Sequence, residues 1–294
     1  MTDIILGILL EGLIYGILAL GVYISYKVLD FADLSVDGTF PLGSAVATRM
    51  ITAGLNPWLS LPLSFAAGMV AGALTGILHV KLKIKDLLSG ILVMTLLYSV
   101  NYRIVGRPTA NLINEETIFS SFSHIFPEGT ASVYVKLFAV FVIIVFVKLL
   151  LDLYLKTKSG FLLRSTGDNE KLVVSLGKNP GSMKILGLSL ANGLVALSGA
   201  VNLQSTFSFN VAGGTGKVVM GLAAVIIGST VFRKISFMKT TTAVIIGMII
   251  YKACISVALS AGFEAYDLNL IISVLFILTL CINNFVLKRG DDVA

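Results

Sequence analysis

Charged residues are scarce in this chain. Of its 294 residues, 13% are charged and 56% are hydrophobic, whereas about a quarter of the residues of an ordinary soluble domain are charged. With a mean hydropathy of +0.94, the composition excludes a soluble domain and predicts a polytopic membrane protein. The net charge of +6 does not indicate a nucleic-acid partner, because the basic residues lie in short loops between apolar runs, where membrane topology accounts for them.

The residues that usually build catalytic and metal centres are also few. The chain has two histidines and two cysteines. Cys254 and Cys281 both fall in apolar runs without CxxC spacing, so neither a disulfide framework nor a metal site is predicted. The sequence GGTGK at 213–217 looks like a phosphate-binding loop, but Val218 follows the lysine where Ser or Thr should coordinate magnesium. We therefore predict no catalytic residues, no metal and no cofactor bound by this chain.

Apolar runs of the length needed to cross a hydrocarbon core of about 30 Å recur along the whole chain. They predict an all-α membrane protein with about nine crossings, within a range of about eight to ten. Two runs are weak, because 38–54 contains Pro41 and Arg49 and 218–231 is short, so each is a candidate for a broken or re-entrant element. The runs are 4–26, 38–54, 58–80, 87–105, 134–155, 185–204, 218–231, 240–260 and 268–287.

Basic residues concentrate in the loops of one side. If the N-terminus is outside, the loops 81–86, 156–184 and 232–239 and the tail all fall on the side that the positive-inside rule assigns to the cytoplasm. The loops left outside, which include 106–133, contain few basic residues. We therefore expect an odd number of spans, an outside N-terminus, a cytoplasmic C-terminus and one transmembrane domain over 1–294.

Glycines are spaced four apart in two of the apolar runs. Gly12 and Gly16 form one such pair, and Gly68, Gly72 and Gly76 repeat the spacing. Small residues on one face of a helix allow a neighbouring backbone to come close. We expect these rows to pack helices inside the bundle and favour this over a subunit interface.

Uncharged polar residues within the spans are candidates for a translocation path, because they usually face the bundle interior or a wet cavity. For each of the amides we favour a contact that holds two helices together over a contact with the solute. The candidates that could hydrogen-bond a solute are Tyr98, Asn101, Asn192, Asn202 and Gln204.

Few ionisable residues lie at membrane depth. The segments 87–105 and 185–204 contain no Asp or Glu, which argues against coupling to protons or sodium. Lys252, in the middle of a span, is the exception. We interpret it as an internally satisfied or snorkelling lysine rather than a gating residue.

Three aspartates stand between the first two apolar runs, in DFADLSVDGTF at 30–40. On one helix face Asp30, Asp33 and Asp37 would repel each other, and no further acidic ligand adjacent to them supports a cation site. We favour Asp37 as the cap of a helix that begins near Gly38, because a carboxylate there would satisfy free backbone amides.

The sequence LLRSTGDNEKLVVSLGKNPGSMK at 162–184 is long and polar for its place between two apolar runs. The spacing of Leu172, Val173 and Leu176, with GDNE before them and GKNPG after them, predicts a short amphipathic helix along the membrane face. The pattern alone leaves open whether this helix only joins two spans or docks a cytosolic partner.

Three stretches resemble one family of membrane proteins. Residues 11–47, EGLIYGILALGVYISYKVLDFADLSVDGTFPLGSAVA, look like the first two helices of the permeases of bacterial ABC importers of the branched-chain amino acid and ribose type. Residues 164–204 and 218–232 resemble later segments of that family, although it more often has GG near Gly228. The resemblance covers most of the chain, is weakest over 106–133, and is closest to single-permease amino-acid systems with a lipoprotein receptor.

The resemblance implies a multi-pass subunit of the bacterial inner membrane that is not itself an enzyme. Its cytoplasmic coupling segment, 156–184, would dock on a separate ATPase that binds ATP and magnesium. Two ATPases, a second copy of the permease, membrane lipid and an extracellular substrate-binding lipoprotein would be its partners, with 106–133 as a docking surface for the lipoprotein. The residues that would form the coupling element are Arg164, Gly167, Asp168, Asn169, Glu170 and Gly177.

The substrate expected from this resemblance is a small solute. An amino acid is the first candidate, and an aromatic amino acid is one option within that class. The alternative from a different class is an ion-coupled secondary transporter, for which Lys252 is the only fair candidate as a titratable residue.

Overall fold

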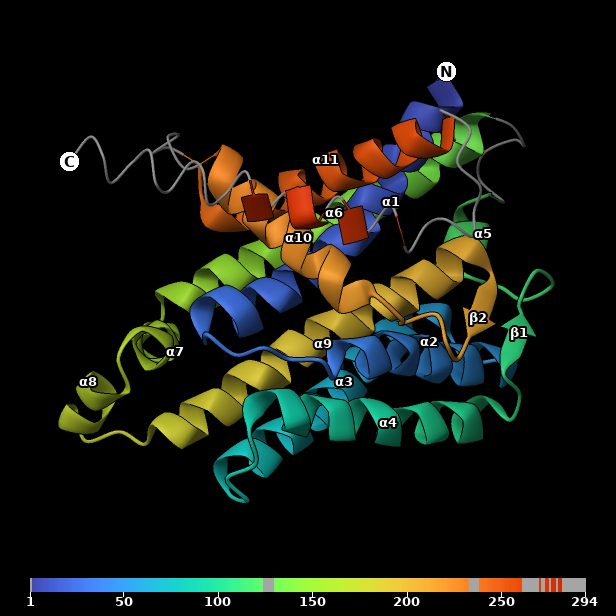
Figure 1. Ribbon diagram of the computed structural model, residues 1–294. Helices are drawn as coiled ribbons and strands as arrows, with labels where there is room; N and C mark the ends of the chain where they lie inside the picture. Colours follow the sequence, from blue (N-terminus) through green and yellow to red (C-terminus); the bar gives the residue numbers. More distant parts are fainter. Residues whose placement is uncertain are drawn as a thin grey trace.

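The computed structural model describes residues 2–123, 130–232 and 238–260, with a few more between 270 and 281. Within these ranges nearly all of the chain is helical, and the long helices lie side by side as a bundle (Figure 1). Two short strands, β1 and β2, pair antiparallel, with Thr109 opposite Asn210. The elements are α1 Thr2–Val22, the π-helix η1 Tyr23–Val28, α2 Val36–Thr52, α3 Pro57–Val80, α4 Asp86–Val105, β1 Thr109–Asn111, α5 Ile118–Ser123, α6 Thr130–Lys156, α7 Lys158–Asp168, α8 Glu170–Ser175, α9 Pro180–Thr206, β2 Ser208–Asn210, α10 Lys217–Val231 and α11 Thr240–Ser260.

Helices of membrane-crossing length confirm a polytopic helical membrane protein. Six of them among the described residues are long and apolar enough to span: Ile4–Val28, Pro57–Val80, Asp86–Val105, Val133–Lys156, Pro180–Thr206 and Thr240–Ser260. The two runs that looked weak in the sequence form α2 and α10, of 17 and 15 residues. More than half of the run 268–287 lies outside the described residues, so the count of about nine crossings and the sidedness of the termini stay predictions.

The glycine rows pack helices inside the bundle, as predicted. A Cβ added to Gly12 would lie 2.9 Å from the Ile249 Cγ1 atom of α11, and one added to Gly76 would lie 2.8 Å from the Ile185 Cα atom of α9. Along α3 the glycines at 68, 72 and 76 meet α9 at successively earlier residues. The two helices are therefore antiparallel and in backbone contact.

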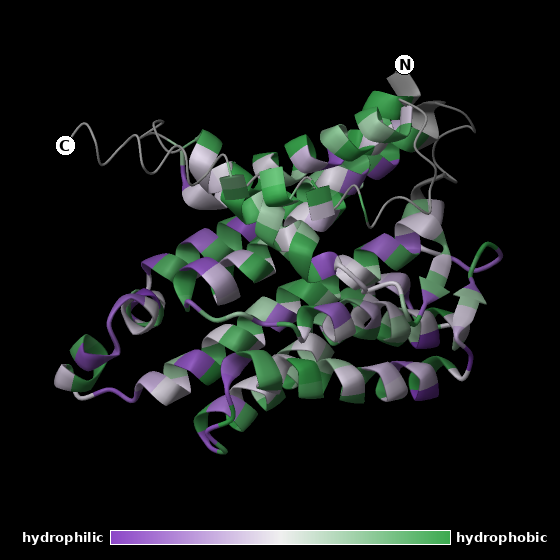
Figure 2. Cartoon of the chain, in the orientation of Figure 1, coloured by the Kyte–Doolittle hydropathy of each residue, from purple (hydrophilic) through white to green (hydrophobic). Residues whose placement is uncertain are grey.

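The three basic loops lie at the same end of the bundle. Because α9 is antiparallel to α3, the loop after α3 and the segment before α9 share that end. Helix α1 is antiparallel to both α9 and α11, since Ser198 Oγ donates to the Ile14 carbonyl and Gly16 faces Ile245, so the loop before α11 lies there too. Helices α7 and α8 project at this end, among hydrophilic loop residues (Figure 2).

Helices α2 and α10 both begin inside the bundle. A Cβ at Gly38, in the first turn of α2, would lie 2.9 Å from the Met94 Cα atom near the middle of α4, and Gly221 of α10 faces Leu18 of α1. The two N-termini meet, because the Asp37 carboxylate accepts hydrogen bonds from the backbone N–H groups of Gly216 (2.9 Å) and Val218 (2.8 Å). The prediction that Asp37 caps its own helix was wrong.

The reason for this correction lies in the surroundings of the α10 N-terminus. The N-cap of α2 is Ser35, which makes no side-chain capping bond, and the N-cap of α10 is Gly216, which has no side chain to offer. Free N–H groups in an apolar bundle need an acceptor from another element. Asp37 supplies it across 179 and 181 positions of the sequence.

A repeated spacing accompanies this meeting point. Phe31, Gly38, Gly43 and Ala45 stand at the same separations as Phe209, Gly216, Gly221 and Ala223. Each set runs from the segment before a short helix into that helix, and α2 and α10 leave the meeting point in opposite directions. The order long helix, short helix, long helix therefore occurs twice with inverted direction, in α1–α2–α3 and in α9–α10–α11.

Gly43→Ala tests the close contact between α2 and α9. A Cβ at Gly43 would collide with the Ala196 carbonyl, so we expect a loss of about 1–3 kcal/mol in stability from overpacking. Gly7→Ala is the matched control, because a Cβ at Gly7 has no heavy atom within 4 Å. Thermal unfolding in detergent measures both; equal melting temperatures for the two variants would contradict the packing described.

Asp37→Asn tests the junction of the two short helices. The change replaces one of two accepting oxygens by a donor that faces a backbone N–H, so we expect about 1–3 kcal/mol of destabilisation. Asp30→Asn, at an exposed aspartate of the same segment with φ of 51°, should leave the melting temperature unchanged, because Asn tolerates this backbone conformation. A similar drop in both variants would show that Asp37 has no special role.

Candidate translocation and coupling site

The start of α2 is fixed to α9 by a buried polar network. Asn192 Nδ2 donates to Asp33 Oδ2 (2.7 Å), and Ser35 Oγ donates to Asn192 Oδ1 (3.1 Å). Asp33 Oδ1 also accepts from the Ser35 backbone N–H (2.9 Å). All three side chains are buried, so the segment between η1 and α2 is tied to the middle of α9.

The second buried amide reaches α2 from the other side. Asn101 Nδ2 of α4 donates to the Gly38 carbonyl (3.0 Å), and its buried Oδ1 atom has no hydrogen-bond partner among the described residues. Two of the five predicted path residues, Asn101 and Asn192, are thus brought to the first turn of α2. Both hold helices together in this conformation.

The other three predicted path residues lie elsewhere. Gln204 is buried at the opposite end of α9, where its Oε1 accepts from the Ile118 N–H (2.9 Å) and its Nε2 donates to Ser60 Oγ (2.9 Å). Asn202 is half-buried. Tyr98 is 53% exposed on α4. The structure does not gather the five residues into one site.

A charged cluster that was not predicted lies between α1, α10 and α11. Lys252 Nζ donates to Glu11 Oε2 (2.8 Å) and stands 4.1 Å from the centroid of the Tyr15 ring. Lys217 Nζ donates to the Tyr15 hydroxyl (3.1 Å), and the Tyr15 ring stacks on Phe40 at 5.8 Å. Lys252 has its partner within the protein, as our interpretation of this residue requires.

A signal for this cluster does exist in the sequence. Glu11 is a lone acidic residue in the first apolar run, and Lys252 is a lone basic residue in another. Opposite single charges in different spans usually pair, because either one alone is costly at membrane depth. The pairing of Lys217 with Tyr15 has no comparable signal.

The segment predicted as one amphipathic helix consists of two helices. Helix α7 ends at Asp168, and Asn169 Oδ1 caps α8 by accepting from the N–H groups of Lys171 (3.0 Å) and Leu172 (3.4 Å). The predicted start and stop are confirmed: Asn169 is the cap, and Gly177 after α8 has φ of 69°. Helix α7, which begins directly after α6 at the Thr157 N-cap, was not predicted.

Helix α8 is held firmly but presents apolar side chains outward. Val173 is buried, and Glu170 Oε1 forms an ion pair with Lys184 Nζ of α9 at 2.6 Å. Leu172, Val174 and Leu176 are 45%, 60% and 51% exposed. A protein that is otherwise solvated at this end would not favour three such side chains on one short helix.

The predicted coupling residues fall into two groups. Gly167 contacts the end of η1, because a Cβ there would collide with the Val28 carbonyl. The other five are exposed around α7 and α8: Arg164, Asp168, Asn169, Glu170 and Gly177. The segment therefore joins an exposed surface to the helix that leads into the Asp33 network.

No metal centre is formed by the part of the chain that the structure describes. No group of three His, Cys, Asp or Glu residues there could hold a metal ion. The three aspartates at 30–40 separate, since Asp33 and Asp37 each have other partners and Asp30 is exposed.

Comparison with known proteins gives a consistent set of relatives. The chain is 43% identical to the "Tyrosine transport system permease protein" of Clostridioides difficile. The similarity extends over 280 residues, which are 95% of this chain and 91% of the relative. It is 24% identical to the "Ribose import permease protein RbsC" of Haemophilus influenzae, over 78% of this chain and 69% of the relative. A chain of the solved structure "PsaBC from Streptococcus pneumoniae in complex with Fab" has the same fold, with a TM-score of 0.52, 13% identity and coverage of 92% of this chain and 89% of that one.

The model of one protein family matches nearly the whole chain. The match, to "Branched-chain amino acid transport system / permease component", extends over residues 4–282. The family match and the six membrane-length helices among the described residues together identify a multi-pass protein of the bacterial inner membrane. The chain belongs to the permease family of branched-chain amino acid transport systems, as the resemblance in the sequence had indicated.

Proposed function

We propose that this permease is the translocation subunit of an ATP-driven importer of an amino acid with an aromatic side chain. The similarity to a tyrosine transport permease supports the substrate class, because it is far greater than the similarity to the ribose permeases. The observation that carries the energy-coupling part is α8, which is capped by Asn169, contacts α9 through the Glu170–Lys184 ion pair and displays three apolar side chains.

In this proposal the ATPase is a separate subunit that binds α7 and α8 at the basic end of the bundle, and that end is cytoplasmic. The docked surface comprises Leu172, Val174 and Leu176 with the polar residues around them. Motion of the ATPase would pass from Gly167 to the Val28 carbonyl at the end of η1. From there it would reach Asp33, Asn192 and the start of α2.

The complete importer in this proposal contains two ATPases, a second permease copy and an extracellular binding lipoprotein. The lipoprotein would deliver the solute at the end of the bundle where β1 and β2 pair. Of the five path candidates, Tyr98 and Asn202 are the two whose side chains are not enclosed. Asn101, Asn192 and Gln204 would line a path only after the helices that they join separate.

The alternative, a secondary transporter, relies on a titratable residue at membrane depth. Lys252 was the candidate for that role, and it forms an ion pair with Glu11 at 2.8 Å. An ion pair between helices has a structural explanation that needs no transported ion. The contact therefore gives Lys252 a structural role that does not require ion coupling.

The double variant Val174→Ser/Leu176→Ser tests the coupling surface. Burial of one such side chain contributes about 1.5–3 kcal/mol, so the pair should weaken binding of an ABC-type ATPase at least about tenfold. Ile113→Ser is the control, since Ile113 is 70% exposed near β1 at the opposite end. The measurement is the amount of ATPase, identified by mass spectrometry, and the ATP hydrolysis that co-purify with each variant. Equal amounts for all variants would overturn the assignment.

Glu11→Gln and Lys252→Met test the ion pair and the energy source together. Glu11→Gln removes the partner of the Lys252 ammonium group, and the Lys252 side chain is only 12% exposed. Lys252→Met removes the partner of the Glu11 carboxylate, and that side chain is 59% exposed. We expect the first variant to be the less stable, and the double variant to recover much of the loss.

Tyrosine uptake by vesicles that contain the assembled transporter completes this test. Uptake should require ATP and persist with an ionophore in all variants that fold. Uptake that survives ATP depletion and stops with the ionophore would support the secondary transporter instead.

A further inference from the structure

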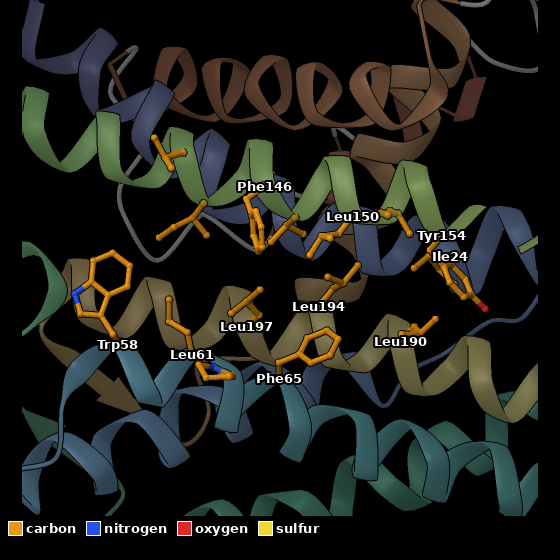
Figure 3. A pocket seen from close by; sticks show the side chains of 15 residues that line it. Ile24, Trp58, Leu61, Phe65, Phe146, Leu150, Tyr154, Leu190, Leu194 and Leu197 are labelled. Carbon is orange, nitrogen blue, oxygen red and sulfur yellow. The ribbon is translucent and has the colours of Figure 1, made fainter. Parts of the chain in front are cut away.

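An apolar cavity that is open on one side lies between α6 and the pair of helices α3 and α9. Its volume is about 700 Å³, and Figure 3 shows Phe146 and Leu150 of α6 on one wall and Phe65, Leu194 and Leu197 on the other. Trp58 lies at one end and Tyr154 at the other. A smaller cavity of about 450 Å³ adjoins it at Trp58.

The cavity exists because α6 packs against α1 and leans away from α3 and α9. On the α1 side, Ile144 Cδ1 lies 2.8 Å from the position of a Cβ on Gly16, and Ile144 is buried. On the cavity side, Phe146 and Leu150 are 62% and 51% exposed. One wall is therefore a single helix, and the other is the packed core of the bundle.

The lining chemistry excludes a polar ligand. Every lining side chain is apolar or aromatic, and the Tyr154 hydroxyl already has Ser159 Oγ at 3.1 Å. A free amino acid or a sugar would lose its hydrogen bonds with water there and gain none. The cavity is thus separate from any path for the solute.

The length of the cavity matches one acyl chain. It extends from Tyr154 at the basic end to Trp58 in the first turn of α3, the turn farthest from the basic loop after α3. Both walls are membrane-length helices, and along α6 the lining runs from Val142 to Tyr154, a rise of about 18 Å. Half of a hydrocarbon core is about 15 Å. Tyr154 lies at the end of the bundle with the basic loops, where tyrosine is favoured at the level of the head groups.

The Tyr154 end also offers positive charge. Lys156 and Lys158 follow Tyr154 in sequence, and both are exposed. Basic residues beside a membrane helix attract anionic lipid head groups. The phosphate of a lipid at this level would lie beside these lysines with its acyl chain extending along α6 toward Trp58.

We propose that this cavity binds an acyl chain of an anionic phospholipid from the leaflet on the basic side of the protein. The head group lies beside Lys156 and Lys158, and the chain end lies near Trp58. The lipid fills the gap beside α6, which continues into α7 after Thr157. This site does not depend on the proposed substrate or on the ATPase.

The single tryptophan of the chain provides the test, since Trp58 lies in the cavity wall. The purified full chain in detergent is titrated with phosphatidylglycerol brominated either near the end of the acyl chain or near the head group. We expect Trp58 fluorescence to be quenched saturably at about one lipid per chain, and more strongly by bromine near the chain end. Phosphatidylcholine with the same bromine positions should bind more weakly.

Two pairs of variants separate a built site from ordinary surrounding lipid. Leu150→Phe fills the cavity, whereas Leu153→Phe, at a residue that is 62% exposed on α6 outside the lining, does not. Lys156→Gln/Lys158→Gln should weaken binding roughly fivefold per lysine, whereas Lys81→Gln/Lys85→Gln at the same end should not. Melting temperatures establish that each variant folds.

Three results would overturn the proposal. The first is quenching that rises without saturation, equally for both bromine positions and in both phenylalanine variants, because this indicates surrounding lipid only. The second is equal binding of the two lipids by all lysine variants, which removes the head-group assignment. The third is Trp58 fluorescence that neither brominated lipid quenches, in a sample that has the mass of a dimer. A second copy of the chain then covers the cavity.

Discussion

The hydrogen bonds from Gly216 and Val218 to Asp37 are the interaction on which the centre of the fold depends. Two helices that begin inside an apolar bundle expose free N–H groups where no water can satisfy them. The carboxylate of α2 satisfies those of α10, with distances of 2.9 and 2.8 Å. Without this contact the free N–H groups at the start of α10 would be left unsatisfied inside an apolar bundle.

The inverted repeat explains how long helices surround this junction. Helix α3 packs on α9 through glycines, and α1 packs on α11 in the same way, so the equivalent pairs of the two halves use the same kind of contact. The repeated Phe, Gly, Gly and Ala positions place small residues at the start of each short helix. In lipid there is no hydrophobic driving force between helices, and association depends on van der Waals packing. Small residues allow the backbones to come close enough for such packing.

Much of this arrangement is visible in the sequence, and the rest depends on long-range partners. Glycine spacing, basic loops and the weakness of 38–54 and 218–231 predicted the packing, the shared end of the loops and the two unusual helices, because each is a local pattern. The partner of Asp37 lies about 180 residues away and that of Lys252 lies 241 away. Neither partner has a spacing that identifies it. The amides were ambiguous for the same reason, and the structure engages Asn101, Asn192 and Gln204 in contacts between elements.

The network at Asp33 connects the exposed end of the protein with its centre. Gly167 of α7 contacts the Val28 carbonyl, and the next few residues lead to Asp33, which Asn192 holds to α9. Asp37 follows within one turn and caps α10. The π-helix η1 and the two short helices α2 and α10 therefore lie in series between α7 and the centre of the bundle, with buried hydrogen bonds at Asp33 and part-buried ones at Asp37. In the proposed importer, such a series would carry a displacement of α7 to the junction between the two halves.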